Sequence, residues 1–386
     1  MTQKIYEDDS YLYEFTATVV SCREVSSGLF DIELDRTAFF PEGGGQYADK
    51  GTINGLDVIT VSEKDDVILH RVCEPIPAGT AVSGIVDREM RFLRMQNHTG
   101  EHLVSGIIHS EFGYNNVGFN FDDKKVTLIV DGPLTDEQIT DIENKANEAV
   151  FRNAAVTAYY PDAETLASLD YRSKLENIQN VRIVNIEGYD TCACCAPHLK
   201  GTAEIGLIKI IGRASDRGGT RLLIVCGRLA LEDYQNKHKA VRDIMAALAV
   251  KEEETAAAVK KMSADLLEER KKNADLLCRM AAMQLRTPER SAGGILYAFT
   301  EGAGCNELIT CLNDMTVEPG ETYLLLSGND KNGYFFVMSN KEGSLRQDWD
   351  KISSAVKING GGDDHFRQGK CRSTKEEILS ALNKTD

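Results

Sequence analysis

The sequence predicts an α+β protein made of four consecutive parts. Short alternating apolar and polar runs dominate residues 1–90, helical and strand patterns alternate over residues 91–227, and a long Ala-, Leu-, Lys- and Glu-rich stretch without Pro or Gly covers residues 229–285. We therefore expect a small antiparallel β-barrel at 1–90, an α+β domain at 91–227, a long helical hairpin or coiled-coil arm at 228–290 and a C-terminal α/β domain at 291–386.

The barrel prediction rests on β-rich runs that are separated by Gly, Pro and Asp. The runs are "TATVVSCREV", "LFDIELD", "LDVITVSEKDDVILHRV" and "GTAVSGIVD". Alternation with a period of two is typical of strands with one buried face, and several short strands in succession favour a small antiparallel barrel.

The second part combines helices with strands. The stretches "NHTGEHLVSGIIHSEF" and "LTDEQITDIENKANEAV" have helical patterns, and Thr135 followed by Gln138 has the spacing of a capping box at the start of the second helix. The runs "KVTLIVD", "GLIKIIG" and "TRLLIVCG" predict strands.

The arm and the tail follow. Residues of the arm recur at spacings of three, four or seven, which is the pattern of a helical hairpin or coiled coil. They are Val241, Ile244, Leu248, Thr255, Val259, Met262 and Leu266. In the tail, "ETYLLLSG" and "GYFFVMSN" predict strands of a compact α/β domain.

Composition limits the class of protein. A chain of 386 residues with 42% hydrophobic residues can bury a substantial core. The acidic N-terminus, "MTQKIYEDDSYLYEF", lacks the basic start and apolar run of a signal peptide, and no apolar stretch reaches the roughly 18 residues of a membrane span. We expect a cytoplasmic protein without a membrane partner, in which the ten cysteines stay reduced.

The net charge of −16 opposes binding to nucleic acid through the field of the whole molecule. A polyanion would have to contact local basic clusters instead. The candidates for phosphate contacts are Lys260, Lys261, Arg270, Lys271 and Lys272. Runs this short would also be found on an ordinary solvated helix face.

Two ligand pairs point to a metal site. His98 and His102 are four residues apart, so a helix places both imidazoles on one face, and "CCAPH" supplies Cys194 and His198 at a turn. Together they have the composition of a tetrahedral Cys-His₃ zinc site. Cys192 and Cys195 could replace Cys194 as the thiolate ligand, and His109 lies on the same helical stripe but is a weaker candidate.

The stretch "TAFFPEGGGQYADKG", residues 37–51, has three consecutive glycines after an aromatic β-rich run. Glycines expose backbone N–H groups and permit close approach of a ligand. A glycine-rich hairpin turn would have the same spelling.

Taken in order, "TAFFPEGGGQYADKG", "NHTGEHL" and "CCAPHLKGTAEIG" resemble the editing domain of alanyl-tRNA synthetase and the freestanding alanyl-tRNA editing proteins. "NGGGDDHFRQGK", residues 359–370, is similar to the glycine motif in the C-terminal domain of the synthetase and of the long form of the editing proteins. No segment that could be an ATP-dependent activation and tRNA-charging domain precedes the barrel. We therefore expect a trans-editing hydrolase rather than a synthetase, with the zinc in the α+β editing domain.

The resemblance implies hydrolysis of the aminoacyl ester on tRNA(Ala) mischarged with serine or glycine, and one Zn²⁺ per chain. By this resemblance the metal ligands are His98, His102, Cys194 and His198. The residues that position substrate are Thr37, as the partner of the serine hydroxyl, together with Gly44, Gly45 and Gln46. Gly360, Gly361 and Gly362 are candidate tRNA contacts in the tail, and the arm or the C-terminal domain is expected to form a homodimer.

The chain departs from the family's usual spelling in two places. Cys195, Ala196 and Pro197 stand where Gly-Gly-Thr usually separates the cysteine from the histidine, and "GGGDDHF" replaces the more usual stretch in the tail. The spacing between Cys194 and His198 is the same as in the family, but this chain has no threonine hydroxyl between them that could have a role. The preference between serine and glycine, and whether zinc acts on the ester directly or positions it, stay open at this point.

Two other functions compete with editing. "HTGEH" also fits H-x-x-E-H, the spelling of zinc peptidases in which the glutamate is the general base. Those enzymes normally use a carboxylate as the third ligand, and we interpret Glu101 as a solvated helix residue. The third function is a tRNA-binding regulator that keeps zinc for structure and does not hydrolyse its ligand.

Overall fold

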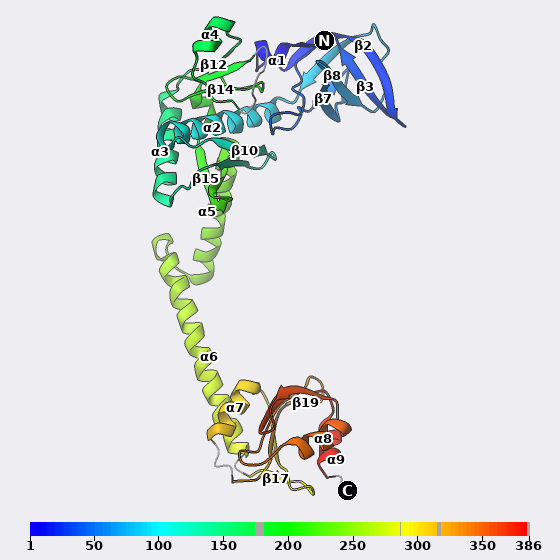
Figure 1. The fold of residues 1–386 in the computed structure, drawn as a ribbon, viewed down its shortest axis with the longest axis vertical. Helices are drawn as coiled ribbons and strands as arrows, with labels where there is room; N and C mark the ends of the chain where they lie inside the picture. Colours follow the sequence, from blue (N-terminus) through cyan, green and yellow to red (C-terminus); the bar gives the residue numbers. More distant parts are fainter. Residues whose placement is uncertain (174–180, 286, 315–317, 384–386) are drawn as a thin grey trace. The chain divides into compact units, whose positions relative to one another are not determined.

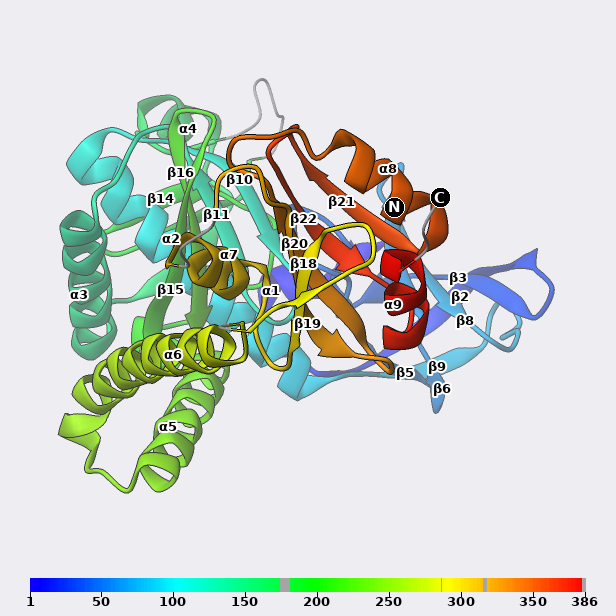
Figure 2. The same cartoon turned by 90° about the horizontal axis from the view of Figure 1, so that it is seen from below.

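The computed structural model describes residues 1–173, 181–285, 287–314 and 318–383. The chain divides into two compact units, Met1–Ala240 and Val241–Asp386, which Figures 1 and 2 show as ribbons. Within the described residues, no helix is both long enough and apolar enough to cross a membrane.

A seven-stranded antiparallel sheet forms the start of the first unit, in the order β6-β5-β9-β2-β3-β8-β7. Its strands are β2 (Glu14–Ser26), β3 (Leu29–Leu34), β5 (Gly51–Ile53), β6 (Leu56–Asp57), β7 (Thr60–Lys64), β8 (Val67–Val72) and β9 (Ala81–Val86). A short parallel pair, β1 (Gln3–Lys4) with β4 (Arg36–Thr37), and the helix α1 (Ile5–Asp8) accompany it. The run of antiparallel strands confirms the strand prediction for residues 1–90.

The long strand β2 curves this sheet. Residues 14–18 pair with β9, whereas the stretch from Val19 onward pairs with β3 across two register shifts. Buried side chains such as Ile32, Leu34 and Ile53 belong to one core cluster and have no exposure to solvent. The edge strands β6 and β7 are joined in sequence but are not paired with each other, so the pairings give a half-barrel instead of the closed barrel that we expected.

The helix α2 (Arg88–Phe112) carries the first half of the candidate metal site. It begins where the Asp87 carboxylate accepts a hydrogen bond from the Met90 N–H, and it ends at Gly113, whose φ of 71° is the left-handed conformation that favours glycine. Most of its length is buried, because α2 packs against both β-sheets of the α+β part.

Two sheets and a second helix complete this part of the first unit. One sheet is antiparallel and consists of β10 (Asn116–Phe121), β11 (Val126–Val130), β16 (Gly219–Cys226) and β15 (Ile208–Asp216). The other consists of β12 (Val156–Tyr159), β13 (Ile183–Ile186) and β14 (Asp190–Ala193). The remaining helices are α3 (Asp136–Arg152), α4 (Ala163–Ser168) and the 3₁₀ turn η1 (Thr202–Ile205). The capping box of Thr135 and Gln138 is present at the start of α3, as predicted.

Two long helices occupy the predicted arm. They are α5 (Arg228–Leu248) and α6 (Thr255–Leu285), with the 3₁₀ turn η2 (Glu252–Glu254) between them. Helical structure at this place is confirmed. The pairing of helices into a hairpin or coiled coil stays a prediction, as do the boundaries of the four domains.

A six-stranded mixed sheet forms the tail of the second unit, in the order β17-β18-β19-β20-β22-β21. Its elements are β17 (Glu289–Arg290), β18 (Leu296–Thr300), α7 (Cys305–Asp314), β19 (Tyr323–Asn329), β20 (Gly333–Ser339), α8 (Arg346–Ala355), β21 (Ile358–Gly362), β22 (Phe366–Cys371) and α9 (Lys375–Asn383). The helices α8 and α9 lie on one side of this sheet, and α7 with the end of α6 lies on the other (Figure 2). Buried side chains of the sheet pack with both groups of helices. Strands occur at both predicted places.

Candidate metal centre

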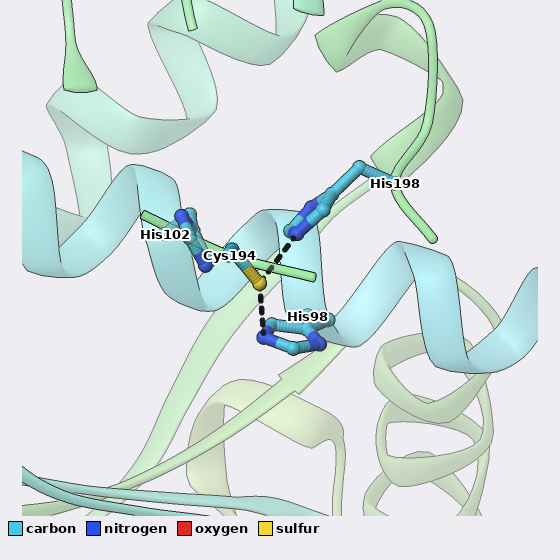
Figure 3. Close-up of side chains that lie close together, drawn as sticks. All are labelled: His98, His102, Cys194 and His198. Carbon is cyan, nitrogen blue, oxygen red and sulfur yellow. Dashed lines mark hydrogen bonds between the residues drawn. The ribbon is translucent and has the colours of Figure 1, made fainter. Parts of the chain in front are cut away.

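Four side chains converge at one point of the first unit (Figure 3). His98 and His102 project from successive turns of α2, Cys194 follows β14 directly, and His198 lies on the turn after it. One ligand atom from each lies within 4.8 Å of all the others. The Cys194 Sγ is 3.3 Å from His198 Nε2 and 3.8 Å from His98 Nε2.

These spacings fit a tetrahedral metal. Bonds of about 2.0–2.1 Å to nitrogen and about 2.3 Å to sulfur place neighbouring ligand atoms about 3.3–3.6 Å apart. All three imidazoles are at least 96% buried, so their donor atoms face one another rather than solvent. A Cys-His₃ donor set of borderline softness suits Zn²⁺.

Each histidine is oriented through its second ring nitrogen. The Nδ1 of His98 lies 2.9 Å from Gln46 Oε1, that of His102 lies 3.1 Å from Asp190 Oδ2, and that of His198 lies 3.0 Å from Thr99 Oγ1. In the tautomer with a proton on Nδ1, every Nε2 keeps a lone pair for a metal. Second partners of this kind are typical of metal-binding histidines, because they fix the ring and its tautomer.

Burial and neighbouring charge set the protonation of the cluster. Burial alone raises the pKa of the Cys194 thiol, but the imidazoles of His98 and His198 outweigh it and hold that pKa well below its ordinary value. Burial lowers the pKa of His198 to about 3, against the opposing influence of the Cys194 sulfur. A thiolate beside a neutral imidazole is the protonation state that binds a metal ion. His102 differs, because burial lowers its pKa but Cys192, Asp190 and Cys194 outweigh burial and hold that pKa well above the ordinary value, so this imidazole has to release a proton when a metal binds.

Cys194 is the cysteine that joins the three histidines. Cys192 instead groups with His102 and Asp190, and Cys195 is exposed. Burial raises the pKa of the Cys192 thiol, so Cys192 favours the protonated form. His109 lies outside this four-residue cluster, and its Nδ1 is 3.3 Å from the Tyr114 carbonyl oxygen.

A cavity of about 870 Å³ opens beside the cluster. Backbone and side chains from the N-terminal segment, α2, β10 and the β14 turn line it. The lining includes Lys4, Gly44, His98, Glu101, His102, Asn116, Phe119, Tyr160, Arg172, Arg182 and Cys194. The cavity can therefore bring a ligand into contact with the candidate metal ligands and with one glycine of the glycine motif.

The glycine motif reaches the centre through Gln46. Besides contacting His98 with its oxygen, the buried Gln46 side chain has an Nε2 without a hydrogen-bond partner among the described residues. Gly44 and Gly45 have φ values of 60° and 83°, in the left-handed region. A Cβ on Gly45 would lie 2.6 Å from the Phe119 carbonyl oxygen, whereas one on Gly44 would meet no atom of a described residue within 4 Å.

The structure does not bring Thr37 to this cavity. Among the described residues that line the cavity Thr37 is absent, and its side chain is fully buried in the half-barrel. Its Oγ1 lies 2.8 Å from His70 Nε2 and accepts a hydrogen bond from the Phe39 N–H. Burial lowers the pKa of His70 to about 4, so this imidazole is neutral and its Nε2 accepts the Thr37 proton.

The interpretation of Glu101 as a solvated helix residue is wrong. Its side chain is 97% buried and lines the cavity, and its Oε1 accepts a hydrogen bond of 2.7 Å from Asn116 Nδ2. Glu101 lies three residues after His98, on nearly the same face of α2. The sequence contained a signal for the burial of Glu101, because residues three and four apart in a helix share a face and Glu101 follows His98 by three.

The sequence also missed the partners of the ligands. Asp190 accepts bonds of 2.7 and 2.8 Å from the Arg172 guanidinium while it holds His102. Arg182 donates to the carbonyl oxygens of Cys194 and Ala196 and so fixes the turn that carries the cysteine.

The candidate tRNA contacts all lie in the second unit. Lys260, Lys261, Arg270 and Lys271 are exposed on α6, and the exposed Lys272 forms ion pairs with Glu268 and Glu269. Gly360, Gly361 and Gly362 are exposed on β21.

One family model and several known proteins match this chain. The family described as "Threonyl and Alanyl tRNA synthetase second additional domain" matches residues 181–223, which include Cys194 and His198. Alanyl-tRNA editing protein Aarsd1 of Bos taurus is 31% identical over 77% of this chain and 71% of its own length. That of Rattus norvegicus is 28% identical over 97% of this chain and 96% of its own length.

A synthetase is also similar over a shorter stretch. Alanine–tRNA ligase of Halobacterium salinarum is 33% identical over 62% of this chain but over only 28% of its own length. The editing protein of Rattus norvegicus, in contrast, matches along nearly all of the chain. The chain belongs to the family of alanyl-tRNA editing proteins.

Proposed function

We propose that this protein is a trans-editing hydrolase that deacylates tRNA(Ala) mischarged with serine or glycine, with one Zn²⁺ per chain. The observation that carries the proposal is the Cys-His₃ cluster, which lies beside a cavity that also reaches the glycine motif. Membership in a family of editing proteins supplies the substrate class.

The reaction compensates for the limited selectivity of the synthetase pocket. A pocket shaped for the methyl group of alanine cannot exclude the smaller glycine, and it rejects an added hydroxyl by only about a hundredfold. A second enzyme that hydrolyses the wrong ester restores accuracy. A cytoplasmic location, where charged tRNA is used, goes with this role.

The residues of the centre have distinct tasks in this proposal. His98, His102, Cys194 and His198 would hold zinc, which as a Lewis acid would polarise the ester carbonyl. Gln46, Asp190 and Thr99 keep the three imidazoles in position, and Gly44 leaves room for the terminal adenosine or the ester. Attack of water on the carbonyl carbon breaks its bond to the ribose oxygen and releases the amino acid.

Release of labelled serine and glycine from tRNA(Ala) tests the proposal, with alanyl-tRNA(Ala) in parallel. The zinc-loaded protein should release serine or glycine and spare alanine. His102→Ala should lose zinc, measured by mass spectrometry of the metal, and lose hydrolysis while its circular dichroism is unchanged. His238→Ala is the matched control, because His238 is exposed on α5 and far along the chain from the cluster.

Other results would favour the rival functions. Retention of every aminoacyl-tRNA by zinc-loaded protein that still binds tRNA would contradict editing and support a regulator. Cleavage of peptide substrates would support the H-x-x-E-H peptidase, which the position of Glu101 in the cavity keeps in consideration.

Contacts with tRNA and self-association complete the proposal. The exposed basic residues of α6 and the glycines of β21 are proposed to meet tRNA phosphates, and the arm is proposed to form a homodimer. Both proposals rest on exposed groups of the second unit.

A further inference from the structure

Glu101 is a buried carboxylate for which neither the metal centre nor the fold accounts. One of its oxygens accepts the hydrogen bond from Asn116, whose own Oδ1 is held by the Gly118 N–H. Among the ion pairs of the described residues, none involves Glu101. A carboxylate with 3% exposure that forms no ion pair with any described residue is costly, unless a ligand brings the missing charge.

The other charged groups of the cavity are already engaged or exposed. Glu7 accepts a hydrogen bond of 2.7 Å from the Tyr160 hydroxyl, and Asp170 is exposed. The Arg172 guanidinium interacts electrostatically with Glu101, but its hydrogen bonds go to the Asp190 carboxylate and to the Ser105 hydroxyl. Glu101 is thus the buried anion of the cavity that is available to a ligand.

An aminoacyl-tRNA has one cationic group near its reactive ester, the α-ammonium. Phosphates and the ribose offer a buried carboxylate no charge of opposite sign. Glu101 also lies between His98 and His102 along α2, so a group bound to it lies next to the proposed metal ligands. The α-ammonium is one carbon atom away from the ester carbonyl, and Glu101 lines the same cavity as His98, His102 and Cys194.

We propose that the Glu101 carboxylate binds the α-ammonium group of the aminoacyl ester and that Asn116 orients it. This inference rests on the proposed function for its substrate class. It implies that the site selects esters with a free, protonated α-amino group. Esters whose amino group is replaced by a hydroxyl or blocked by acylation, as in peptidyl-tRNA, would leave Glu101 buried without a partner and would be rejected.

Binding of non-hydrolysable analogues tests the inference apart from catalysis. The probes are an acceptor-stem RNA with serine linked through a 3′-amide and the same RNA carrying the α-hydroxy counterpart of serine, which is nearly isosteric and neutral. The zinc-loaded full-length protein should bind the α-amino probe at least about tenfold more tightly by fluorescence anisotropy, because a desolvated ion pair is lost with the amine. Glu101→Gln should abolish that ratio by weakening the α-amino probe alone.

A matched variant separates charge recognition from folding. Glu111→Gln removes a carboxylate of the same helix whose partner is Lys145 outside the cavity, and it should keep the wild-type ratio. Equal weakening of both probes in Glu101→Gln would assign Glu101 a structural role and overturn the inference. An unchanged ratio would overturn it as well.

Hydrolysis of the seryl ester, measured in parallel, distinguishes this inference from the proposed function. If the protein prefers the α-amino probe through Glu101 but hydrolyses no ester, the result supports the ammonium site and contradicts the proposed editing function. If it hydrolyses seryl-tRNA(Ala) without preferring the α-amino probe, editing stands and the ammonium site falls. Binding of neither probe refutes the ammonium site directly.

Discussion

Asp190 connects the candidate metal centre with a buried cation. Its carboxylate lies 3.1 Å from His102 Nδ1 and also accepts two hydrogen bonds from Arg172. Burial raises the pKa of Asp190, but the His102 ring and the Arg172 guanidinium outweigh it and hold that pKa below its ordinary value. An ionised Asp190 keeps the Nδ1 proton of His102 in place and leaves its Nε2 for the metal.

Asp190→Asn should therefore weaken zinc binding by about 10–100-fold, since an amide stabilises the oriented imidazole less than a carboxylate does. Competition with a chromogenic zinc chelator measures the affinity. Glu187→Gln, an exposed change in the same β-hairpin, should leave the affinity unchanged. Equal zinc affinity of Asp190→Asn and the wild type would show that the carboxylate has no part in metal binding.

Thr37 gives the second prediction at this scale. Thr37→Val keeps the shape of the side chain but leaves His70 Nε2 without a donor and the Phe39 N–H without an acceptor. We expect a loss of about 1–3 kcal/mol in the free energy of unfolding, and equal effects on the hydrolysis of seryl- and glycyl-tRNA(Ala). Thr37→Ser should restore stability.

The ratio of the two hydrolysis rates decides between this structural role and recognition of substrate. A selective loss of seryl-tRNA hydrolysis in Thr37→Val would support the hydrogen bond to the serine hydroxyl that the family resemblance implies. With its proton donated to His70 and one lone pair occupied by the Phe39 N–H, the Thr37 hydroxyl keeps one lone pair that could accept a hydrogen bond from the serine hydroxyl.

How much of the site was predictable is clearest among these residues. The i, i+4 pair His98 and His102 follows from helix geometry, and the Cys194 and His198 pair was found by its own spacing. Their partners Gln46, Asp190 and Thr99 were not predictable, because each lies 52 to 99 residues from the histidine it holds. Tertiary folding alone brings such pairs together.

At the scale of elements, local sequence signals predicted the helix ends correctly, but they did not predict whether the N-terminal sheet closes into a barrel. The capping box at Thr135 and the Gly113 end of α2 depend on a few neighbouring residues. Whether β6 and β7 pair depends on a strand order set by long-range contacts, and the two residues between them, Val58 and Ile59, bond instead to Gly51 and Arg71. Periodicity predicts strands but not their partners.

The turn that carries Gly44 and Gly45 connects the half-barrel with β10. It is held on β10 by the Phe121 N–H, which donates to the Gly45 carbonyl oxygen. Gly45 combines a left-handed φ with close approach to Phe119, and Phe119 in turn stacks on the His98 ring at 4.8 Å. A shift of this turn would therefore move the His98 ring, because both Phe119 and Gln46 contact that ring.

Gly45→Ala should therefore reduce zinc affinity and hydrolysis together, and reduce them more than Gly44→Ala does. Both variants carry the strain of a left-handed φ, about 1–2 kcal/mol, but only Gly45→Ala also forces its Cβ against the Phe119 carbonyl. Zinc titration and deacylation of both variants measure this difference. Equal losses in the two variants would show that φ alone makes these glycines necessary.

At the scale of the whole molecule, the helix α6 leaves an apolar stripe exposed. Val259, Met262 and Leu266 recur at spacings of three and four, and the same heptad pattern continues through the polar Glu269 and Asn273. Beyond them Leu276, Met280 and Met283 complete the stripe, and all six apolar side chains are at least 40% exposed. A stripe of this length would remain in water in a single chain, although a second copy would cover it, and Asn273 would fix the register of the pair.

Two neighbouring leucines test this dimer. Leu266 is on the stripe and Leu267 is one residue off it, about 100° around the helix, yet their exposures of 53% and 57% are nearly equal. Leu266→Glu should place two like charges in the seam and convert a dimer into a monomer in analytical ultracentrifugation, while Leu267→Glu should remain dimeric. Similar sedimentation of both variants and the wild type would exclude α6 as the seam. Because the metal centre lies within the first unit, monomeric Leu266→Glu should keep its zinc, so association and metal binding can be separated in one variant.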